Sequence, residues 1–377
     1  MEATQNYSPG LEGVIAGVSK ISRVDPDIDS LMYRGYDIRD FVANNALYEE
    51  AAYVLLYGEL PSASQLDEFK YKLSSQRDIP DAVYAMIRSV PKDSNYMDVL
   101  RTGVSMLAHF DPDAQSLTHE ANLEKAIRLT AKIPTIVTAS YRIFNNQEPV
   151  KPDPSLTHSQ NFMYMLKGEK PDDTVTKVFD TTMILYAEHG FNASTFCARV
   201  TSSTLADLHG AITAAIATLK GSLHGGANEE AMKMLLEIDS PDRVDAWMHD
   251  ALVNKKKIMG FGHRVYKNGD TRAPILKTMG AELSQKLGQE KWYQMADHVE
   301  QIMMQEKHIH PNVDFPTAYI YYMIGLPIPL YTPLFAASRI AGWAAHVIEQ
   351  LDNNRLIRPK SLYEGPKPRA YISLSDR

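Results

Sequence analysis

This 377-residue chain holds a single cysteine, Cys197, so an intrachain disulfide is excluded. It has no apolar run of the roughly 20 residues that a membrane-spanning helix needs, and residues 1–9 lack the basic start and apolar stretch of a signal peptide. Asp and Glu outnumber Lys and Arg, giving a net charge of -7, which argues against nucleic acid as the main partner. These absences predict a cytoplasmic protein that engages neither a membrane nor nucleic acid.

Several nucleotide and metal motifs are also missing. The turn Gly260-Phe261-Gly262 lacks the third glycine of a dinucleotide fingerprint, and the chain has neither a Gly-Lys-Ser/Thr phosphate loop nor a Gly-x-Ser-x-Gly nucleophile elbow. His, Cys, Asp and Glu do not cluster at zinc-ligand spacing. We therefore expect no metal and no bound cofactor, which leaves acid-base and anion chemistry.

Helical periodicity dominates what is present. Pro61 precedes a Ser62 cap, and Leu66, Phe69 and Leu73 then fall on one helical face. Similar patterns predict helices over residues 96–108, 120–144, 172–189, 202–219, 228–237, 243–254, 273–287, 291–307, 317–323 and 333–352. Strand-like alternation occurs only at 13–24 and 30–33, which predicts a small N-terminal sheet or hairpin. Without regular strand-helix alternation, the sequence predicts an all-α fold and not a parallel-sheet nucleotide fold.

Two glycine-flanked histidines and one carboxylate after a proline are the strongest candidates for chemistry. They lie in Gly221-Ser222-Leu223-His224-Gly225-Gly226, Gly260-Phe261-Gly262-His263 and Pro311-Asn312-Val313-Asp314. Either histidine alone also fits a helix end before a glycine cap. As a set, Asp314 could remove a carbon-bound proton while His224 meets the enolate oxygen and His263 polarises a second carbonyl. This combination predicts a carbon-carbon condensation.

Three arginines could bind the electrophile. They are Arg272, nine residues after His263, Arg339 in Phe335-Ala336-Ala337-Ser338-Arg339, and Arg358. Guanidinium groups clamp carboxylates through paired hydrogen bonds, so convergence of the three would select a dicarboxylate. Each one alone is more often part of a surface ion pair. The sequence leaves their convergence open.

These segments resemble citrate synthase, and the resemblance covers nearly the whole chain. It includes Tyr33-Arg34-Gly35-Tyr36, Glu188-His189-Gly190-Phe191-Asn192-Ala193-Ser194 and Arg358-Pro359-Lys360-Ser361. It implies an acyltransferase that condenses acetyl-CoA and oxaloacetate with water to give citrate and CoA. The positions matching His224 and Asp314 would activate acetyl-CoA, and the one matching His263 would polarise the oxaloacetate ketone. Oxaloacetate would be held by His189, Arg272, Arg339 and Arg358.

The resemblance also implies an architecture. A large helical domain would comprise residues 1–224 and 322–377, and a small helical domain, residues 225–321, would close over substrate. The chain is expected to form a homodimer in which Arg358 enters the neighbouring subunit's active site, with higher oligomers possible.

Residues around the lysine run at 255–257 are candidates for CoA binding. Lysines at a helix end also complement the helix dipole, so the run has an ordinary structural interpretation. The resemblance favours CoA, whose adenine would be held by the backbone of the following turn. The residues it implies are Lys257, Met259, Gly260, Phe261, Gly262, Lys267 and Asn312.

Three features depart from the citrate synthase pattern. Ser222 stands where most relatives carry proline, Asn95-Tyr96 replaces His-Pro, and Pro316-Thr317-Ala318 replaces Tyr-Ser-Gly after Asp314-Phe315. None removes a catalytic side chain. The third lies beside the base, so 2-methylcitrate synthase, a close relative that uses propionyl-CoA, stays an alternative. A non-catalytic helical homologue with an assembly role is disfavoured, because His224, His263 and Asp314 are all kept.

Overall fold

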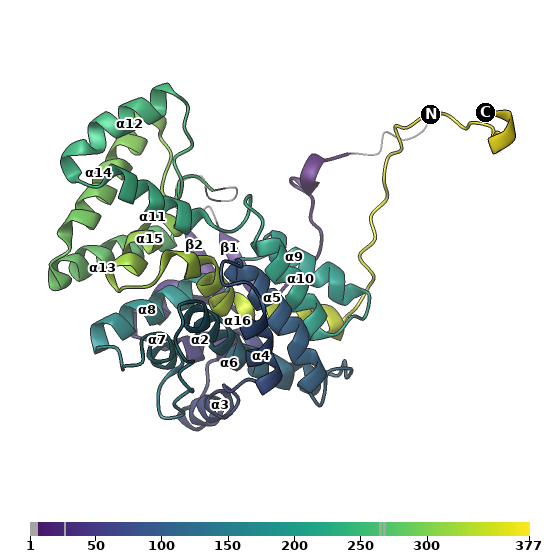
Figure 1. Ribbon diagram of the computed structural model, residues 1–377, viewed down its shortest axis with the longest axis horizontal. Helices are drawn as coiled ribbons and strands as arrows, with labels where there is room; N and C mark the ends of the chain where they lie inside the picture. Colours follow the sequence, from purple (N-terminus) through teal and green to yellow (C-terminus); the bar gives the residue numbers. More distant parts are fainter. Residues whose placement is uncertain (1–6, 26–27, 264–265, 267–268) are drawn as a thin grey trace.

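The computed structural model describes residues 7–25, 28–263, 266 and 269–377, and helices form nearly all of their regular structure (Figure 1). The α-helices are α1 (Ile38–Ala43), α2 (Tyr48–Tyr57), α3 (Ala63–Ser75), α4 (Asp81–Ser89), α5 (Tyr96–Leu107), α6 (His119–Phe144), α7 (His158–Lys167), α8 (Asp173–Tyr186), α9 (Ala193–Ser203), α10 (Leu208–Leu219), α11 (Ala227–Ile238), α12 (Val244–Val253), α13 (Arg272–Leu287), α14 (Glu290–Lys307), α15 (Asp314–Met323) and α16 (Tyr331–Asp352). Short 3-10 turns are η1 (Pro9–Leu11), η2 (Ala108–Phe110), η3 (Pro241–Arg243), η4 (Ile328–Leu330) and η5 (Leu374–Asp376). The all-α prediction is confirmed. Among the described residues, no helix is long and apolar enough to cross a bilayer.

A small antiparallel sheet lies near the start of the chain. Its strands, β1 (Ser22–Asp25), β2 (Ser30–Tyr33) and β3 (Tyr36–Asp37), pair in the order β1-β2-β3. The strand predicted at 30–33 is confirmed. The strand predicted at 13–24 was largely wrong, because strand β1 begins only at Ser22 and residues 14–19 have no ladder partner.

Helix α16 forms the centre of the large helical body. It is buried along most of its 22 residues, including Trp343 and Arg339, as expected for a helix surrounded by others. It packs against α2, α6, α8, α9 and α10. Helices α11–α15 pack largely on one another at one side of this body (Figure 1). The predicted domain boundaries stay a prediction.

Local capping explains both a success and an error. Ser62 caps α3 as the sequence predicted, since its hydroxyl accepts a hydrogen bond from the Gln65 backbone N–H. The Gln65 side chain in turn accepts from the Ser62 backbone N–H. The single helix predicted over 202–219 was wrong. The chain breaks after α9, where Leu205 has φ +66° and Asp207 caps α10 by accepting from the Gly210 N–H. Helices α1, α2, α4, α7 and most of α9 were not predicted.

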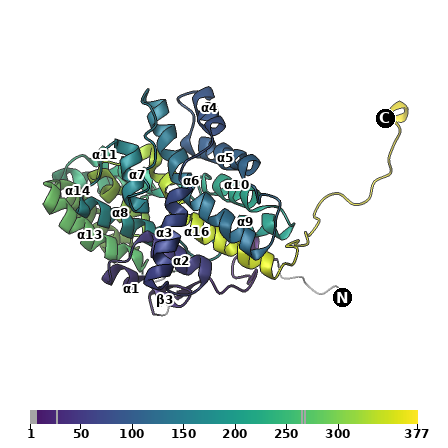
Figure 2. The same ribbon diagram turned by 90° about the horizontal axis from the view of Figure 1, so that it is seen from below.

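The C-terminal tail leaves the end of α16 and runs away from the helical body (Figure 2). Its root is tied to α9, where Asn354 Nδ2 donates to the Ser203 carbonyl and the Ile357 N–H donates to Ser203 Oγ, both at 3.0 Å. Beyond this anchor, Arg358 and the rest of the tail are exposed.

Candidate active site

His224 lies in the turn between α10 and α11 and is held by the start of α9. Its Nε2 lies 3.2 Å from the Ser194 backbone N and 2.7 Å from Ser194 Oγ, and that hydroxyl oxygen accepts from Trp343 Nε1. A backbone N–H can only donate, so Nε2 must carry the lone pair and the ring proton lies on Nδ1. The structure therefore provides His224 as a neutral hydrogen-bond donor through Nδ1.

His263 has the opposite tautomer by the same reasoning. The Tyr266 backbone N–H donates to His263 Nδ1 at 3.3 Å, which leaves the ring proton on Nε2. Burial and the nearby Arg272 charge lower the pKa of His263 to about 4. Burial followed by the Arg339 charge does the same for His224, to about 4. Both rings are therefore neutral near pH 7 and suited to polarise oxygen atoms without carrying charge.

His189 lies next to His263, in the loop between α8 and α9. The two ring centroids are 5.0 Å apart, and His189 Nε2 lies 3.3 Å from the Tyr266 hydroxyl. Burial and the Arg272 charge hold the pKa of His189 well below its usual value. This places a third neutral imidazole beside a buried guanidinium.

Arg272, the first residue of α13, is fixed by a buried carboxylate. Asp270 Oδ1 and Oδ2 accept from Arg272 Nε and Nη2 at 2.9 and 2.7 Å, and Arg272 is only 3% exposed. Asp270 Oδ2 also accepts from the Val313 backbone N–H at 3.0 Å. One carboxylate thus orients the arginine and the start of α15 together, which brings Arg272 close to Asp314.

Arg339 reaches the same region from α16. It is 1% exposed, its Nε donates to the Tyr186 carbonyl at 2.6 Å, and its guanidinium lies over the Phe335 ring. Burial and the neighbouring Arg272 charge lower its pKa. Two close buried guanidiniums repel each other, so a ligand with two carboxylates would relieve that repulsion.

Asp314 opens α15 and is the carboxylate of the site. Its Oδ1 accepts from the Tyr186 hydroxyl at 2.7 Å, and its backbone N–H donates to Asn312 Oδ1 at 3.0 Å. Burial raises the pKa of Asp314, while the Tyr186 hydrogen bond and the Arg272 charge oppose that rise. A carboxylate with a raised pKa is a stronger base than a solvated aspartate, which suits proton removal from carbon.

The predicted CoA turn has a tight backbone structure. Gly262 N–H donates to the His310 carbonyl and the Asn312 N–H to the Gly260 carbonyl, both at 2.9 Å, and Asn312 Nδ2 donates to the Gly262 carbonyl at 3.0 Å. Gly260 has φ +83°, and an added Cβ would lie 2.7 Å from Phe315 Cβ, so this position requires glycine. The turn is thereby locked to the start of α15.

The other predicted CoA residues are less constrained. Met259 and Phe261 are partly buried in this turn and Lys257 is exposed beside it, whereas Lys267 lies outside the described residues. Within the described part of the chain, no group of three or more His, Cys, Asp or Glu residues is arranged to hold a metal ion.

The structure brings six of the predicted site residues into one region: His189, His224, His263, Arg272, Asp314 and Arg339. Arg358 is not among them, since it lies on the exposed tail. Sequence reasoning missed Asp270, Ser194, Tyr186 and Tyr266. Asp270 stands two residues before Arg272, and that spacing is the one feature that could have identified it.

Comparison with known proteins gives a consistent result. The family model "Citrate synthase, C-terminal domain" matches residues 10–360. The citrate synthase of Haloferax volcanii is 46% identical over 98% of each chain, and 2-methylcitrate synthase 1 of Corynebacterium glutamicum is 43% identical over 98% of each. A citrate synthase from Thermoplasma acidophilum, solved as a ternary complex with carboxymethyl coenzyme A and oxaloacetate, superposes with a TM-score of 0.93 at 36% identity. That match covers 99% of this chain and 100% of the other.

Proposed function

Because the chain belongs to the citrate synthase family and is a transferase of that type, we propose that it condenses acetyl-CoA with oxaloacetate and water to give citrate and CoA. The observation that carries the proposal is the convergence of Asp314 with neutral histidines and two buried arginines. Carbon acids need both a base and a donor for the enolate oxygen, and this site supplies both.

In the first step, the Asp314 carboxylate takes a proton from the methyl group of the acetyl thioester. His224 donates through Nδ1–H to the thioester oxygen, on which negative charge develops. Because the Nε2 of His224 is already engaged by Ser194, the ring does not need to reorient for this task. Preorganised donors of this kind lower the barrier without a reorganisation cost.

In the second step, the enol carbon attacks the ketone carbon of oxaloacetate. His263 donates through Nε2–H to the ketone oxygen, which becomes the hydroxyl of the product. Arg272, Arg339 and His189 hold the oxaloacetate carboxylates, as the geometry of two fixed guanidiniums suggests. Water then cleaves the thioester, releasing citrate and the CoA thiol.

The CoA moiety is proposed to lie on the turn at residues 259–262, with Lys257, Lys267 and Asn312 beside it. The Thermoplasma acidophilum enzyme, solved with carboxymethyl coenzyme A and oxaloacetate, supports a CoA ester and oxaloacetate as the ligands of this chain by similarity. Residues 225–321 are proposed to form a small domain that closes over substrate on the remaining, larger domain. Closure would exclude water from the enolate.

A homodimer is part of the proposal. Arg358 lies on an exposed tail that leaves its own subunit, which is the arrangement needed for donation to a neighbouring site (Figure 2). Its guanidinium would then complete the oxaloacetate site across the interface. We also propose a cytoplasmic location, in line with the archaeal and bacterial relatives.

Propionyl-CoA is the second candidate acyl donor. Relatives named as 2-methylcitrate synthases match nearly as well as citrate synthases, and the Pro316-Thr317-Ala318 departure lies beside Asp314. A hydrophobic pocket discriminates one methylene by only ~1–3 kcal/mol, so we expect activity with both donors and the higher kcat/KM with acetyl-CoA. A propionyl-CoA preference of about tenfold or more, ~1.4 kcal/mol, would make 2-methylcitrate synthase the better assignment.

The decisive experiment measures release of CoA thiol from acetyl-CoA and oxaloacetate. We expect thiol release that requires both substrates and yields one citrate per CoA. Oxaloacetate-independent thiol release would indicate a thioesterase, and no release with either acyl-CoA would refute the proposed function.

A further inference from the structure

The loop between α8 and α9, residues 187–192, connects the two halves of the proposed site. It carries His189, and Asn192 at its end caps α9 by accepting from the Thr195 N–H at 3.0 Å. Ser194, on the first turn of α9, engages His224. Trp343 Nε1 holds Ser194 separately, so the conformation of this short loop bears first on His189.

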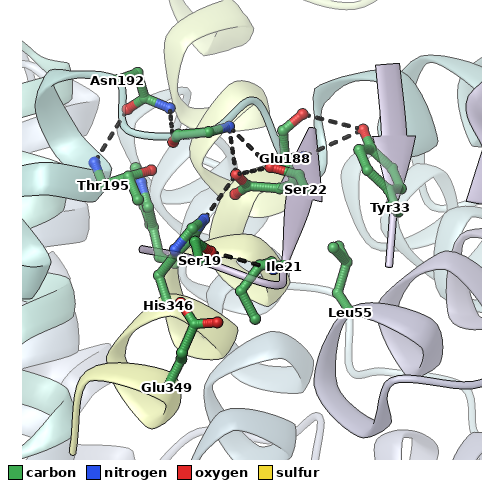
Figure 3. Close-up of polar contacts among 12 residues, drawn as sticks. Ser19, Ile21, Ser22, Tyr33, Leu55, Glu188, Asn192, Thr195, His346 and Glu349 are labelled. Carbon is green, nitrogen blue, oxygen red and sulfur yellow. Dashed lines mark hydrogen bonds and ion pairs between the residues drawn. The ribbon is translucent and has the colours of Figure 1, made fainter. Parts of the chain in front are cut away.

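Glu188 holds the loop from inside the protein. Its side chain is fully buried, and Oε1 accepts from the Gly190 backbone N–H at 2.5 Å, from His346 Nε2 at 2.8 Å and from Ser22 Oγ at 2.9 Å (Figure 3). The Tyr33 hydroxyl adds a contact of 3.2 Å to the Glu188 carbonyl. Elements from both ends of the chain thus meet at the residue next to His189.

The tautomer of His346 follows from its second neighbour. Arg199 Nη1, which can only donate, lies 3.1 Å from His346 Nδ1, so the ring proton must be on Nε2 and points to Glu188. Arg199 Nη1 also donates to Glu349 Oε2 at 2.8 Å, and Glu349 Oε1 accepts from the Lys20 N–H at 2.7 Å. A continuous polar chain therefore runs from the loop through α16 and α9 to the N-terminal segment.

The charge of Glu188 is maintained although it is buried. Burial opposes ionisation, but His346, Arg339 and Ser22 together lower the pKa of the carboxyl below its usual value. Its second oxygen, Oε2, has no hydrogen-bond partner in the described structure and lies against Gly342, where an added Cβ would be 2.4 Å away. An orphaned buried carboxylate oxygen is costly, so packing alone does not explain why a glutamate stands here.

We propose that Glu188 is a positioning residue for oxaloacetate binding. Its carboxylate fixes the His189 loop through the Gly190 N–H and places a buried negative charge near Arg339. This role rests on the proposed function. Glu188 does not touch substrate in this assignment, and it acts through His189 and Arg339. Its loss should weaken oxaloacetate binding and leave acetyl-CoA recognition nearly unchanged.

The test compares Glu188→Gln with Glu49→Gln. Glu49 is an apt control because it is 1% exposed, accepts from the His158 backbone N–H at 2.7 Å and also has an unpartnered Oε2, but it lies in the α2–α7 region, away from the site. Losing a hydrogen-bonded buried charge should raise the KM and the dissociation constant for oxaloacetate about tenfold or more. The KM for acetyl-CoA and kcat at saturation should stay within about threefold, and Glu49→Gln should change thermal stability only.

A milder variant covers the case in which Glu188→Gln does not fold. Ser22→Ala removes one of the three donors and is expected to raise the oxaloacetate KM about threefold. If Glu188→Gln folds, an oxaloacetate KM within about twofold of the parent value would overturn the positioning role. If only Ser22→Ala folds, the same result in that variant would overturn it. Calorimetry on the parent protein distinguishes failure of the positioning role from failure of the proposed function. If the parent does not bind oxaloacetate, the proposed function is refuted, and the positioning role with it.

Discussion

Replacing Asp314 by asparagine tests the base most directly. The amide keeps the shape of the side chain. Its oxygen can still accept from the Tyr186 hydroxyl, which lies 2.7 Å from Oδ1 in the parent. It loses the basicity with which the carboxylate takes the proton. Since a general base contributes 10²–10⁴ in rate, we expect kcat to fall about 10³-fold, equivalent to ~4 kcal/mol of transition-state stabilisation.

Stability and oxaloacetate binding should hardly change in this variant. The carboxylate is desolvated, as its raised pKa indicates, so removing the charge relieves a cost that offsets the weaker hydrogen bond. We expect a change of no more than ~1 kcal/mol in the free energy of unfolding. Arg272 and Arg339 stay in place, so the dissociation constant of oxaloacetate should remain within about threefold of the parent.

The assay follows CoA thiol release at saturating substrates, with oxaloacetate binding measured separately by calorimetry. Asp81→Asn is the matched control, because Asp81 is also the first residue of a helix but is exposed on α4. The control should retain parent activity. Condensation by Asp314→Asn within about tenfold of the parent, or ~1.4 kcal/mol, would remove Asp314 from the role of base.

Other predictions follow from the same geometry. Asp314 must be ionised to act and burial raises its pKa, so kcat/KM should decline as pH falls through that raised pKa. Tyr186→Phe removes a hydrogen bond that stabilises the carboxylate, so it should move this decline to higher pH. An unchanged pH profile in Tyr186→Phe would contradict the prediction. Arg358→Ala chains mixed with Asp314→Asn chains should regain activity, since one site of each heterodimer has both intact groups, whereas mixed dimers that form and stay inactive would refute donation across the interface. Gly260→Ala should raise the KM for acetyl-CoA at least about tenfold by forcing the turn away from Phe315; an unchanged KM would place CoA elsewhere.

Much of the site could be predicted because its chemistry depends on residue type within short segments. Glycines around His224 and His263 allow tight turns, and a carboxylate three residues after Pro311 marked the base. The turn at Gly260 shows the reason, since its φ of +83° and its contact with Phe315 leave no space for a side chain. Such constraints are local and therefore visible in the sequence.

Supporting residues could not be predicted in this way. Tyr186 contacts Asp314 across 128 positions, and Ser194 contacts His224 across 30. Nothing in the sequence around Tyr186 singles it out among the chain's 20 tyrosines. Only packing of α8 against α15 and α16 selects it.

The sequence by itself determined the helical class, the Ser62 cap and the residue types of the candidate catalytic set, because periodicity, capping and turn geometry act over a few residues. The tertiary structure decided the break before Asp207, the pairing of Asp270 with both Arg272 and the start of α15, and the tautomers of His224 and His263. Tautomer and pKa depend on which donors and charges surround a buried ring, and those neighbours come from distant segments. These neighbours surround the histidine rings only after α9, α13, α15 and α16 have packed together.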